Sequence, residues 1–443
     1  MADVLTSDRL ARSAVAAPLL RAVAVSKTYR TPDHIGRLVL ERVDFTLREG
    51  EIVAMLGKSG SGKSTFLRIL AGLVAPSEGR VEYRGRPVEE PVQGIAMVFQ
   101  SFALFPWLTV LGNVELGLEA QGLSAGERRR RAVDAIDLIG LDGFENAYPK
   151  ELSGGMRQRV GFARALVVNP DVLLLDEPFS QLDVLTAESL RGDLAELWTQ
   201  SRIPTRGILM VSHNIEEAVE MADRIIIFSS DPGRISAEVP VALPHPRDPD
   251  STPFRQIMDQ VYTSLTTVPG RDGRRGKPEP IGFGHRLPDA AVQQLSGLIE
   301  RVAEPPYNGR ADLPQLADEE NLVLDELFPL LDFMELLGLA HVSGGDIELT
   351  ASGRAYAAAD MLPRKQMFAD ALLKHVPLAA HIRRVLDERP GHRAPAARFL
   401  RELEDHLSED EAERVLETVI NWGRHAEIFA YDYDDEVLSL ENF

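Results

Sequence analysis

One segment limits the possible folds of this 443-residue chain more than any other part of it. The apolar run 51–56 predicts a buried strand. It is followed at once by the spacing Gly-x-x-x-x-Gly-Lys-Ser and then by a helical pattern that ends near Gly72. Glycines let backbone N–H groups close around phosphate oxygens, and the N-terminus of the next helix adds partial positive charge. A chance Gly/Ser-rich turn is the alternative, but the order strand, loop, helix argues against it. We therefore predict a phosphate-binding loop formed by Gly57, Lys58, Ser59, Gly60, Ser61, Gly62, Lys63, Ser64 and Thr65.

A second apolar run, 173–175, ends in two carboxylates, Asp176 and Glu177. In an α/β sheet, the carboxyl ends of the strands lie at the edge where nucleotides bind. The Lys63 ammonium group is therefore expected at the β- and γ-phosphates of a nucleotide. The Ser64 hydroxyl and Asp176 are expected to hold Mg²⁺, and Glu177 is expected to polarise the attacking water as a general base.

Further unbroken apolar runs at 208–211 and 225–228 predict two more strands. Such runs are typical of parallel strands that are covered on both faces. Between about 110 and 165 the strand pattern stops and helical patterns take over. We therefore predict an α/β nucleotide-binding domain over residues 20–266, with an inserted helical lobe.

Between the two halves of the predicted site lies Leu152-Ser153-Gly154-Gly155-Met156, which closely resembles the signature of ABC-type ATPases. Other motifs of that family occur in the family's order, and the resemblance covers residues 20–266. It implies a P-loop domain of the ABC type. The matching positions outside the signature are Tyr29, Gln100, the segment 180–183 that ends in Asp183, and His213.

The resemblance implies ATP and Mg²⁺ as ligands, and a role for each of these residues. Tyr29 would stack on adenine, and Gln100 would sense Mg²⁺ and face a membrane subunit. His213 would contact the γ-phosphate, although a histidine at a strand end is more often structural. The residues that would cap the γ-phosphate bound by a second copy are Ser153, Gly154 and Gly155. Asp183 ends the segment that matches the D-loop of the family and is expected to contribute to nucleotide binding.

Three positions depart from the family pattern: Met156 stands where the family has Gln, Gln181 where it has Ala, and Asn214 where it has Asp. None of them removes a catalytic group, so the sequence predicts an active ATPase.

The segment 100–110, which contains Pro-Trp-Leu-Thr-Val, looks like the corresponding loop of nitrate, sulfonate and taurine importer ATPases. Its aromatic residues Phe102, Phe105 and Trp107 either pack in a core or dock a membrane subunit; we favour docking. The resemblance implies an importer subunit at the cytoplasmic face of the cell membrane. Its partners would be a second copy or a homologous ATPase, permease subunits and, indirectly, a solute-binding protein. An ABC ATPase with a non-import role is the alternative.

Charge divides the chain into two parts. The net charge is −20, and residues 281–443 hold 31 acidic against 15 basic side chains. The stretch 267–284 is rich in Gly, Pro and charge and predicts a flexible linker. The chain has no cysteine, which excludes disulfides and thiolate metal sites. No apolar run approaches the roughly 18–20 residues that span a bilayer.

Residues 285–443 predict an acidic, mainly helical, winged-helix-like accessory domain. Asp289 is expected to cap its first helix, and Gly344-Gly345 predicts the turn of a β-hairpin. The stretch 318–335, which would include the helix that reads DNA, has seven acidic and no basic residues, so nucleic-acid binding is not expected. No internal repeat is evident. The segment resembles the AAA-associated C-terminal domain of some importer ATPases, and a regulatory or DNA-binding role for it is the alternative.

Overall fold

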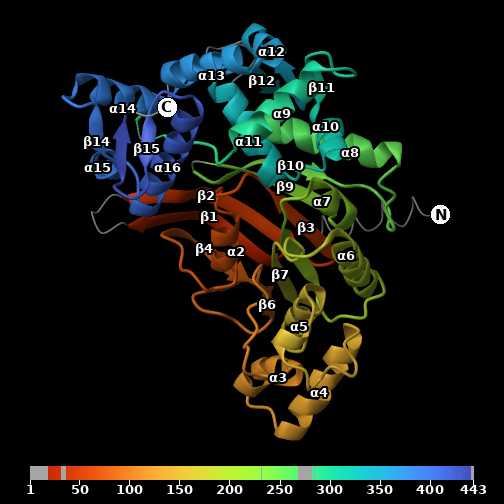
Figure 1. Ribbon diagram of the computed structural model, residues 1–443. Coiled ribbons are helices and arrows are strands. Elements are labelled where there is room, and N and C mark those ends of the chain that lie inside the picture. Colours follow the sequence, from red (N-terminus) through yellow and green to blue (C-terminus); the bar gives the residue numbers. More distant parts are fainter. Residues whose placement is uncertain (1–17, 31–35, 231, 268–281, 284, 441–443) are drawn as a thin grey trace. The chain divides into compact units, whose positions relative to one another are not determined.

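The computed structural model describes residues 18–30, 36–230, 232–267, 282–283 and 285–440. The chain forms two compact units, the first ending at Leu265 and the second beginning at Thr266 (Figure 1). Most of the linker expected at 267–284 lies outside the described residues. Among the helices described, none combines the length and the apolar character that crossing a membrane requires.

The strands predicted from the apolar runs form the centre of the first unit. Over the residues described, they belong to a six-stranded sheet with the order β10-β9-β3-β8-β7-β6. All neighbours pair in parallel except β10, which pairs antiparallel with β9 at the edge. Every residue of β3, β7 and β8 is buried, as expected for strands covered on both faces. The bounds are β3 (Glu51–Leu56), β6 (Ile95–Val98), β7 (Val172–Asp176), β8 (Gly207–Val211), β9 (Arg224–Ser229) and β10 (Arg234–Pro240).

A second, antiparallel sheet, which the sequence patterns did not predict, lies against this one. Its order is β2-β1-β4-β5 over the described part of the chain. The helix α2 (Lys63–Leu70) follows the phosphate loop, and its Phe66 contacts Phe45 of β2 and Phe228 of β9. The core of the unit therefore holds α2 between the two sheets. The strands are β1 (Pro18–Arg30), β2 (Gly36–Arg48), β4 (Glu78–Tyr83) and β5 (Arg86–Pro87).

The predicted helical lobe is present between β6 and β7. Its helices pack on one another and gather at one end of the unit (Figure 1). Each begins at a hydroxyl side chain, Thr109, Ser124 or Ser153, that accepts a backbone N–H of the first turn. The lobe helices are α3 (Val110–Ala120), α4 (Ala125–Leu138) and α5 (Gly154–Leu166), with a 3₁₀ turn at Pro149–Glu151. The remaining helices of this half are α6 (Val184–Thr199), α7 (Ile215–Met221) and α8 (Thr252–Thr266).

The second unit begins with a winged helix. The predicted hairpin is present, with Gly344 and Gly345 at φ of 62° and 87°. The prediction that Asp289 caps the first helix is wrong, because the N-cap is Ala291. The elements are α9 (Val292–Ala303), β11 (Arg310–Asp312), α10 (Leu313–Glu320), α11 (Leu324–Leu336), β12 (Ala340–Ser343) and β13 (Asp346–Leu349).

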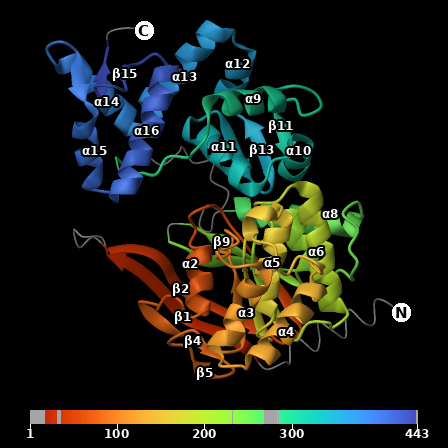
Figure 2. The same cartoon turned by 60° about the horizontal axis from the view of Figure 1, so that its bottom comes forward.

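The same order of elements then occurs a second time. Figure 2 shows the two copies beside each other in the second unit, the later one in blue. The copies are joined by α12 (Ala351–Ala358) and α13 (Met361–His375). The second copy contains α14 (Pro377–Glu388), β14 (Arg393–Pro395), α15 (Ala396–Glu404), α16 (Glu409–His425), β15 (Ala430–Asp432) and β16 (Val437–Ser439).

The hydrogen bonds show that these copies are a structural repeat. The sheets have equivalent orders, β11-β13-β12 and β14-β16-β15. The N–H of Leu313 donates to the Gly345 carbonyl at 2.8 Å, and the N–H of Ala396 donates to the Glu436 carbonyl at 2.9 Å. The expectation of no internal repeat is therefore wrong. The two copies have the same strand order and equivalent backbone hydrogen bonds, but few equivalent positions carry the same residue. The sequence therefore does not reveal the repeat.

Aromatic stacking joins the equivalent helices of the two copies. The rings of Phe333 on α11 and Trp422 on α16 are stacked at 3.9 Å, and Phe368 of α13 meets Phe333 edge-on. Trp422 is only 2% exposed, and its indole N–H donates to the Ala290 carbonyl. Each helix therefore turns part of its surface toward its counterpart.

We predict that Trp422→Ala destabilises the second unit by about 3–5 kcal/mol, because it leaves a large cavity between the copies. Chemical unfolding of the full chain, followed by circular dichroism, measures the loss. Tyr433→Ala removes an aromatic ring that is 60% exposed in the same copy. That control should change stability by only about 0.5 kcal/mol. Equal losses of stability in the two variants would contradict a stabilising role for the Phe333–Trp422 stack.

Candidate active site

The phosphate loop follows β3, and its glycines occupy positions where a side chain is not tolerated. Gly62 has a φ of 93°, and a Cβ there would come within 2.8 Å of Leu40. The Lys63 side chain is buried and folds back over the loop. Its Nζ donates to the carbonyls of Gly57 at 2.6 Å and Lys58 at 3.0 Å. The ammonium group thus lies inside the ring of backbone atoms that would surround a phosphate.

The Ser64 hydroxyl and Asp176 are brought together across the sheet edge. The Ser64 Oγ donates to Oδ1 of Asp176 at 2.8 Å. Burial raises the pKa of Asp176. Two hard oxygen donors at this distance fit Mg²⁺ chemistry, and a cation there would favour the ionised carboxylate.

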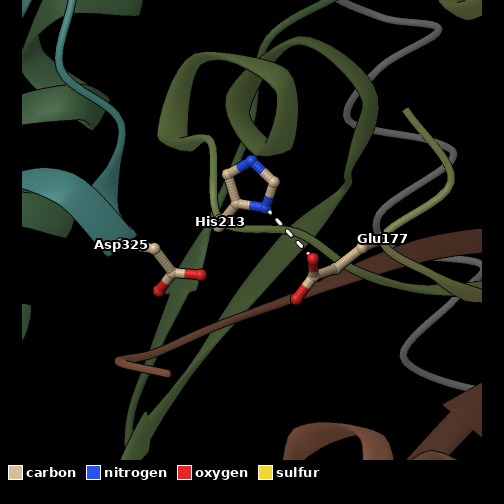
Figure 3. Close-up of side chains that lie close together, drawn as sticks. All are labelled: Glu177, His213 and Asp325. Carbon is tan, nitrogen blue, oxygen red and sulfur yellow. Dashed lines mark ion pairs between the residues drawn. The ribbon is translucent and has the colours of Figure 1, made fainter. Parts of the chain in front are cut away.

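Glu177 is the centre of a second cluster. It has a left-handed φ of 47°, a strained conformation for a residue with a side chain. The Gln100 amide donates to its Oε2 at 2.7 Å, and Nδ1 of His213 lies 3.3 Å from the same oxygen (Figure 3). The hydrogen bond with His213 is the main cause that lowers the pKa of Glu177. The carboxylate is therefore ionised at neutral pH, as a general base must be.

His213 is positioned by the turn between β8 and α7. Asn214 is the N-cap of α7, and its Oδ1 accepts the N–H of Glu217 at 3.1 Å. Asparagine and aspartate are equally good at this position. The departure from the family pattern at Asn214 therefore keeps the cap. Ser212, buried beside it, hydrogen-bonds to the Glu217 carboxylate.

The other predicted residues lie apart from this cluster. Tyr29 is on β1, half-exposed, with the Lys27 ammonium 4.9 Å from its ring centre. Ser153 caps α5, and Asp183 caps α6 by accepting the N–H of Thr186 at 3.1 Å. A Cβ on Gly155 would collide with the Thr186 side chain, and one on Gly154 would lie 3.7 Å from Leu182. The two signature glycines thus pack on the 180–183 loop and on the first turn of α6.

The sequence did not single out three polar residues that form hydrogen bonds with the backbone near the site: Gln158, Asn113 and Arg164. The Gln158 amide is fully buried and donates to the Pro178 carbonyl, next to Glu177, at 2.6 Å. A polar residue on the apolar face of a predicted helix is the only signal that could have found it. Asn113 and Arg164 hold the loop after Gln100, and they are treated below.

Comparisons with known proteins identify two domains in this chain. The ABC transporter family matches residues 40–180, and the C-terminal AAA-associated domain matches residues 314–432. An ATP-binding protein of Brucella abortus is 43% identical over 233 residues, which cover 52% of this chain and 88% of that one. The chain belongs to the ABC transporter ATP-binding proteins. It is therefore an ATPase that binds ATP, with an AAA-associated domain at its C-terminal end.

Other relatives of this ABC ATPase carry more specific names. A nitrate import ATP-binding protein of Synechocystis is 45% identical over 207 residues, covering 47% of this chain and 77% of that one. A taurine import ATP-binding protein of Rhizobium johnstonii is 46% identical over 204 residues, covering 46% and 77%. These matches span about half of the present chain.

We predict that His213→Ala moves the acidic limb of the pH–rate profile to higher pH. Without the histidine hydrogen bond, the pKa of Glu177 rises toward its ordinary value, so the carboxylate becomes protonated at a higher pH. Steady-state ATPase rates over a pH series measure the shift. His341→Ala, an exposed histidine on β12, is the control and should leave the profile in place. An unmoved limb in His213→Ala would contradict the electrostatic link.

Proposed function

We propose that this chain is the ATP-hydrolysing subunit of an ABC importer, with a nitrate-, sulfonate- or taurine-like anion as the transported solute. The names of the relatives support import, since they include nitrate, taurine and aliphatic sulfonate import proteins. The ionised Glu177 beside the phosphate loop carries the hydrolytic part of the proposal. An ABC ATPase in a non-import role is the second candidate.

In this proposal, separate groups of residues bind the phosphates, activate the water molecule and bind the adenine. The backbone N–H groups of residues 57–65 and the Lys63 ammonium bind the β- and γ-phosphates. Glu177 orients a water molecule and accepts its proton as the water oxygen attacks the γ-phosphorus. Gln100 and His213 hold the Glu177 carboxylate, and His213 also contacts the γ-phosphate. Tyr29 stacks on the adenine.

We propose that Mg²⁺ is bound with the nucleotide. Ser64, Asp176 and Gln100 would hold it, which is supported by the 2.8 Å separation of the Ser64 and Asp176 oxygens. When bound, the ion neutralises charge on the β- and γ-phosphate oxygens.

We predict that Glu177→Gln lowers kcat for ATP by ~10²-fold or more while nucleotide binding persists, because the base is lost and the loop is not. Lys63→Ala should instead weaken nucleotide binding. Phosphate release and binding of a fluorescent ATP analogue, with and without EDTA, measure the two effects. Glu188→Gln changes an exposed carboxylate on α6 and should match the wild type. Full turnover by Glu177→Gln would contradict the assignment of the base.

We also propose that two copies, or one copy and a homologous subunit, close face to face around two ATP molecules. The support is the place of the signature. Ser153 caps α5, Gly154 lies against Leu182 of the 180–183 loop, and Gly155 lies against Thr186 of α6, so none of these contacts is with the phosphate loop. They would therefore complete the site of the partner, with Asp183 in the interface.

A mixture of Lys63→Ala and Ser153→Arg chains tests this arrangement. If sites form between chains, a mixed dimer has one site with both defects and one intact site, so the mixture should regain ATP hydrolysis that neither variant shows alone. If each site lies within one chain, no intact site exists in the mixture. Absence of recovery, with mixed dimers shown to form, would exclude the shared site.

The partners outside the ATPase pair follow from the same proposal. The loop with Phe105 and Trp107 would dock a permease subunit, placing the chain at the cytoplasmic face of the membrane, and a solute-binding protein would act indirectly. We further propose residues 20–266 as the nucleotide-binding domain, 267–284 as a linker and 285–443 as an accessory domain. That domain would not bind nucleic acid, since it is acidic and its α11 and α16 stack on each other.

A further inference from the structure

The loop of residues 101–109, named here the 101–109 loop, connects Gln100 to α3 and carries two exposed aromatic side chains. Phe105 is 41% and Trp107 is 70% exposed, and their ring centres lie 5.4 Å apart. Gln100, just before the loop, bonds to Glu177. The position of this loop therefore bears on both the exposed aromatic pair and the candidate base.

Asn113 fixes the far end of the 101–109 loop. Its side chain on α3 is fully buried. Its Oδ1 accepts the N–H of Phe105 at 2.8 Å, and its Nδ2 donates to the carbonyls of Phe105, Leu108 and Thr109 at 3.0–3.2 Å. This end of the loop is tied to the helix that directly follows it.

Arg164 fixes the near end, and it reaches the loop from a distant part of the chain. Its guanidinium, at the end of α5, donates to the carbonyls of Ala103 at 2.6 Å and Phe102 at 3.1 Å. Both of these residues have left-handed φ values, 25° for Phe102 and 48° for Ala103. Arg157, in the first half of α5, adds a second contact, with its guanidinium 5.2 Å from the Phe102 ring centre.

The electrostatic environment of Arg164 is unusual for an arginine. Within the described residues it forms no ion pair with a carboxylate, and its hydrogen-bond acceptors are the two loop carbonyls. The guanidinium is partly buried, and this burial lowers its pKa. A partly buried cation that is satisfied by backbone carbonyls is sensitive to the exact position of that backbone. The planar guanidinium has several N–H donors in a fixed geometry and binds both carbonyls at once. A lysine ammonium group cannot reproduce that geometry.

We propose that Arg164 is a positioning residue that makes the 101–109 loop move together with the signature helix α5. The inference rests on the proposed ATPase function. The N-terminus of α5 carries Ser153, which would act on the ATP of the partner chain. The loop leads back to Gln100, which holds the base of the chain's own site. The hydrogen bonds of Arg164 thus couple the two ATP sites through one helix. They also couple the exposed Phe105–Trp107 pair to that helix, because the pair lies on the same loop.

The test compares Arg164→Met with Arg164→Lys in the full chain. Arg164 touches neither the phosphate loop nor Asp176, so removing it should leave the KM for ATP within about threefold of the wild type. The kcat should fall by ~10-fold, because Gln100 no longer holds Glu177 in one place. Arg164→Lys keeps the charge and one hydrogen bond, so its kcat should lie between the two.

Arg159→Met is the matched control. Arg159 lies on the same helix, but it donates to the Ile139 carbonyl at 3.0 Å and pairs with Asp193 at 2.6 Å, away from the loop. Its kcat should stay near that of the wild type. Limited chymotrypsin digestion gives a second readout: cleavage after Phe102 or Trp107 should accelerate in Arg164→Met and not in Arg159→Met.

The outcomes separate this inference from the proposed function. A wild-type chain without Mg²⁺-dependent ATPase activity would refute the function itself. A folded Arg164→Met with wild-type kcat, or one that loses ATP binding in parallel with kcat, would overturn the positioning role. If Arg164→Met does not fold, Arg164→Lys decides: a lower kcat at unchanged KM supports the link, and wild-type kcat removes it.

Discussion

The nucleotide site depends on the parallel pairing of β3, β8 and β7. The ladder places Met55 beside Val211 and Val211 beside Asp176, so the chain leaves all three strands at nearly the same level. The residues that follow are the phosphate loop, Ser212 with His213, and Glu177. A slip of one residue would turn every side chain of a strand to the opposite face. Both faces of these strands are buried, so a slip would mismatch the close packing of their side chains against the elements that cover the sheet.

The sequence predicted this part well because the constraint acts locally. A strand buried on both faces needs an unbroken apolar run, and its end is marked by the first polar residues, such as Asp176 and Glu177. The orientation of those polar groups could not be predicted. The left-handed φ of Glu177 and the bond from the Gln100 amide arise only when distant loops meet. The motif thus indicates which groups gather, and the fold decides how they are aligned.

Two larger features left no clear signal in the sequence. β1 and β2 are long strands, but register shifts interrupt their pairing, and Ala24 and Arg42 have left-handed φ values. The alternation of polar and apolar residues is blurred there. The winged-helix repeat is hidden for another reason. Ala311 and Ala394 are both buried in equivalent strands, yet most neighbouring positions differ. Packing and backbone hydrogen bonds maintain such a repeat without conserving residue identity.

The helix α5 shows how one element can hold a site together without touching the reacting atoms. Gly155 at its start packs on Thr186, beyond the 180–183 loop, and Gln158 in its middle bonds to the Pro178 carbonyl, one residue after Glu177. Arg164 at its end bonds to the 101–109 loop. Because a helix resists bending, a displacement at one of these contacts is passed to the others. The sequence marks only the first turn of α5 as a motif. The remaining contacts are long-range and polar, and they become visible only in the folded chain.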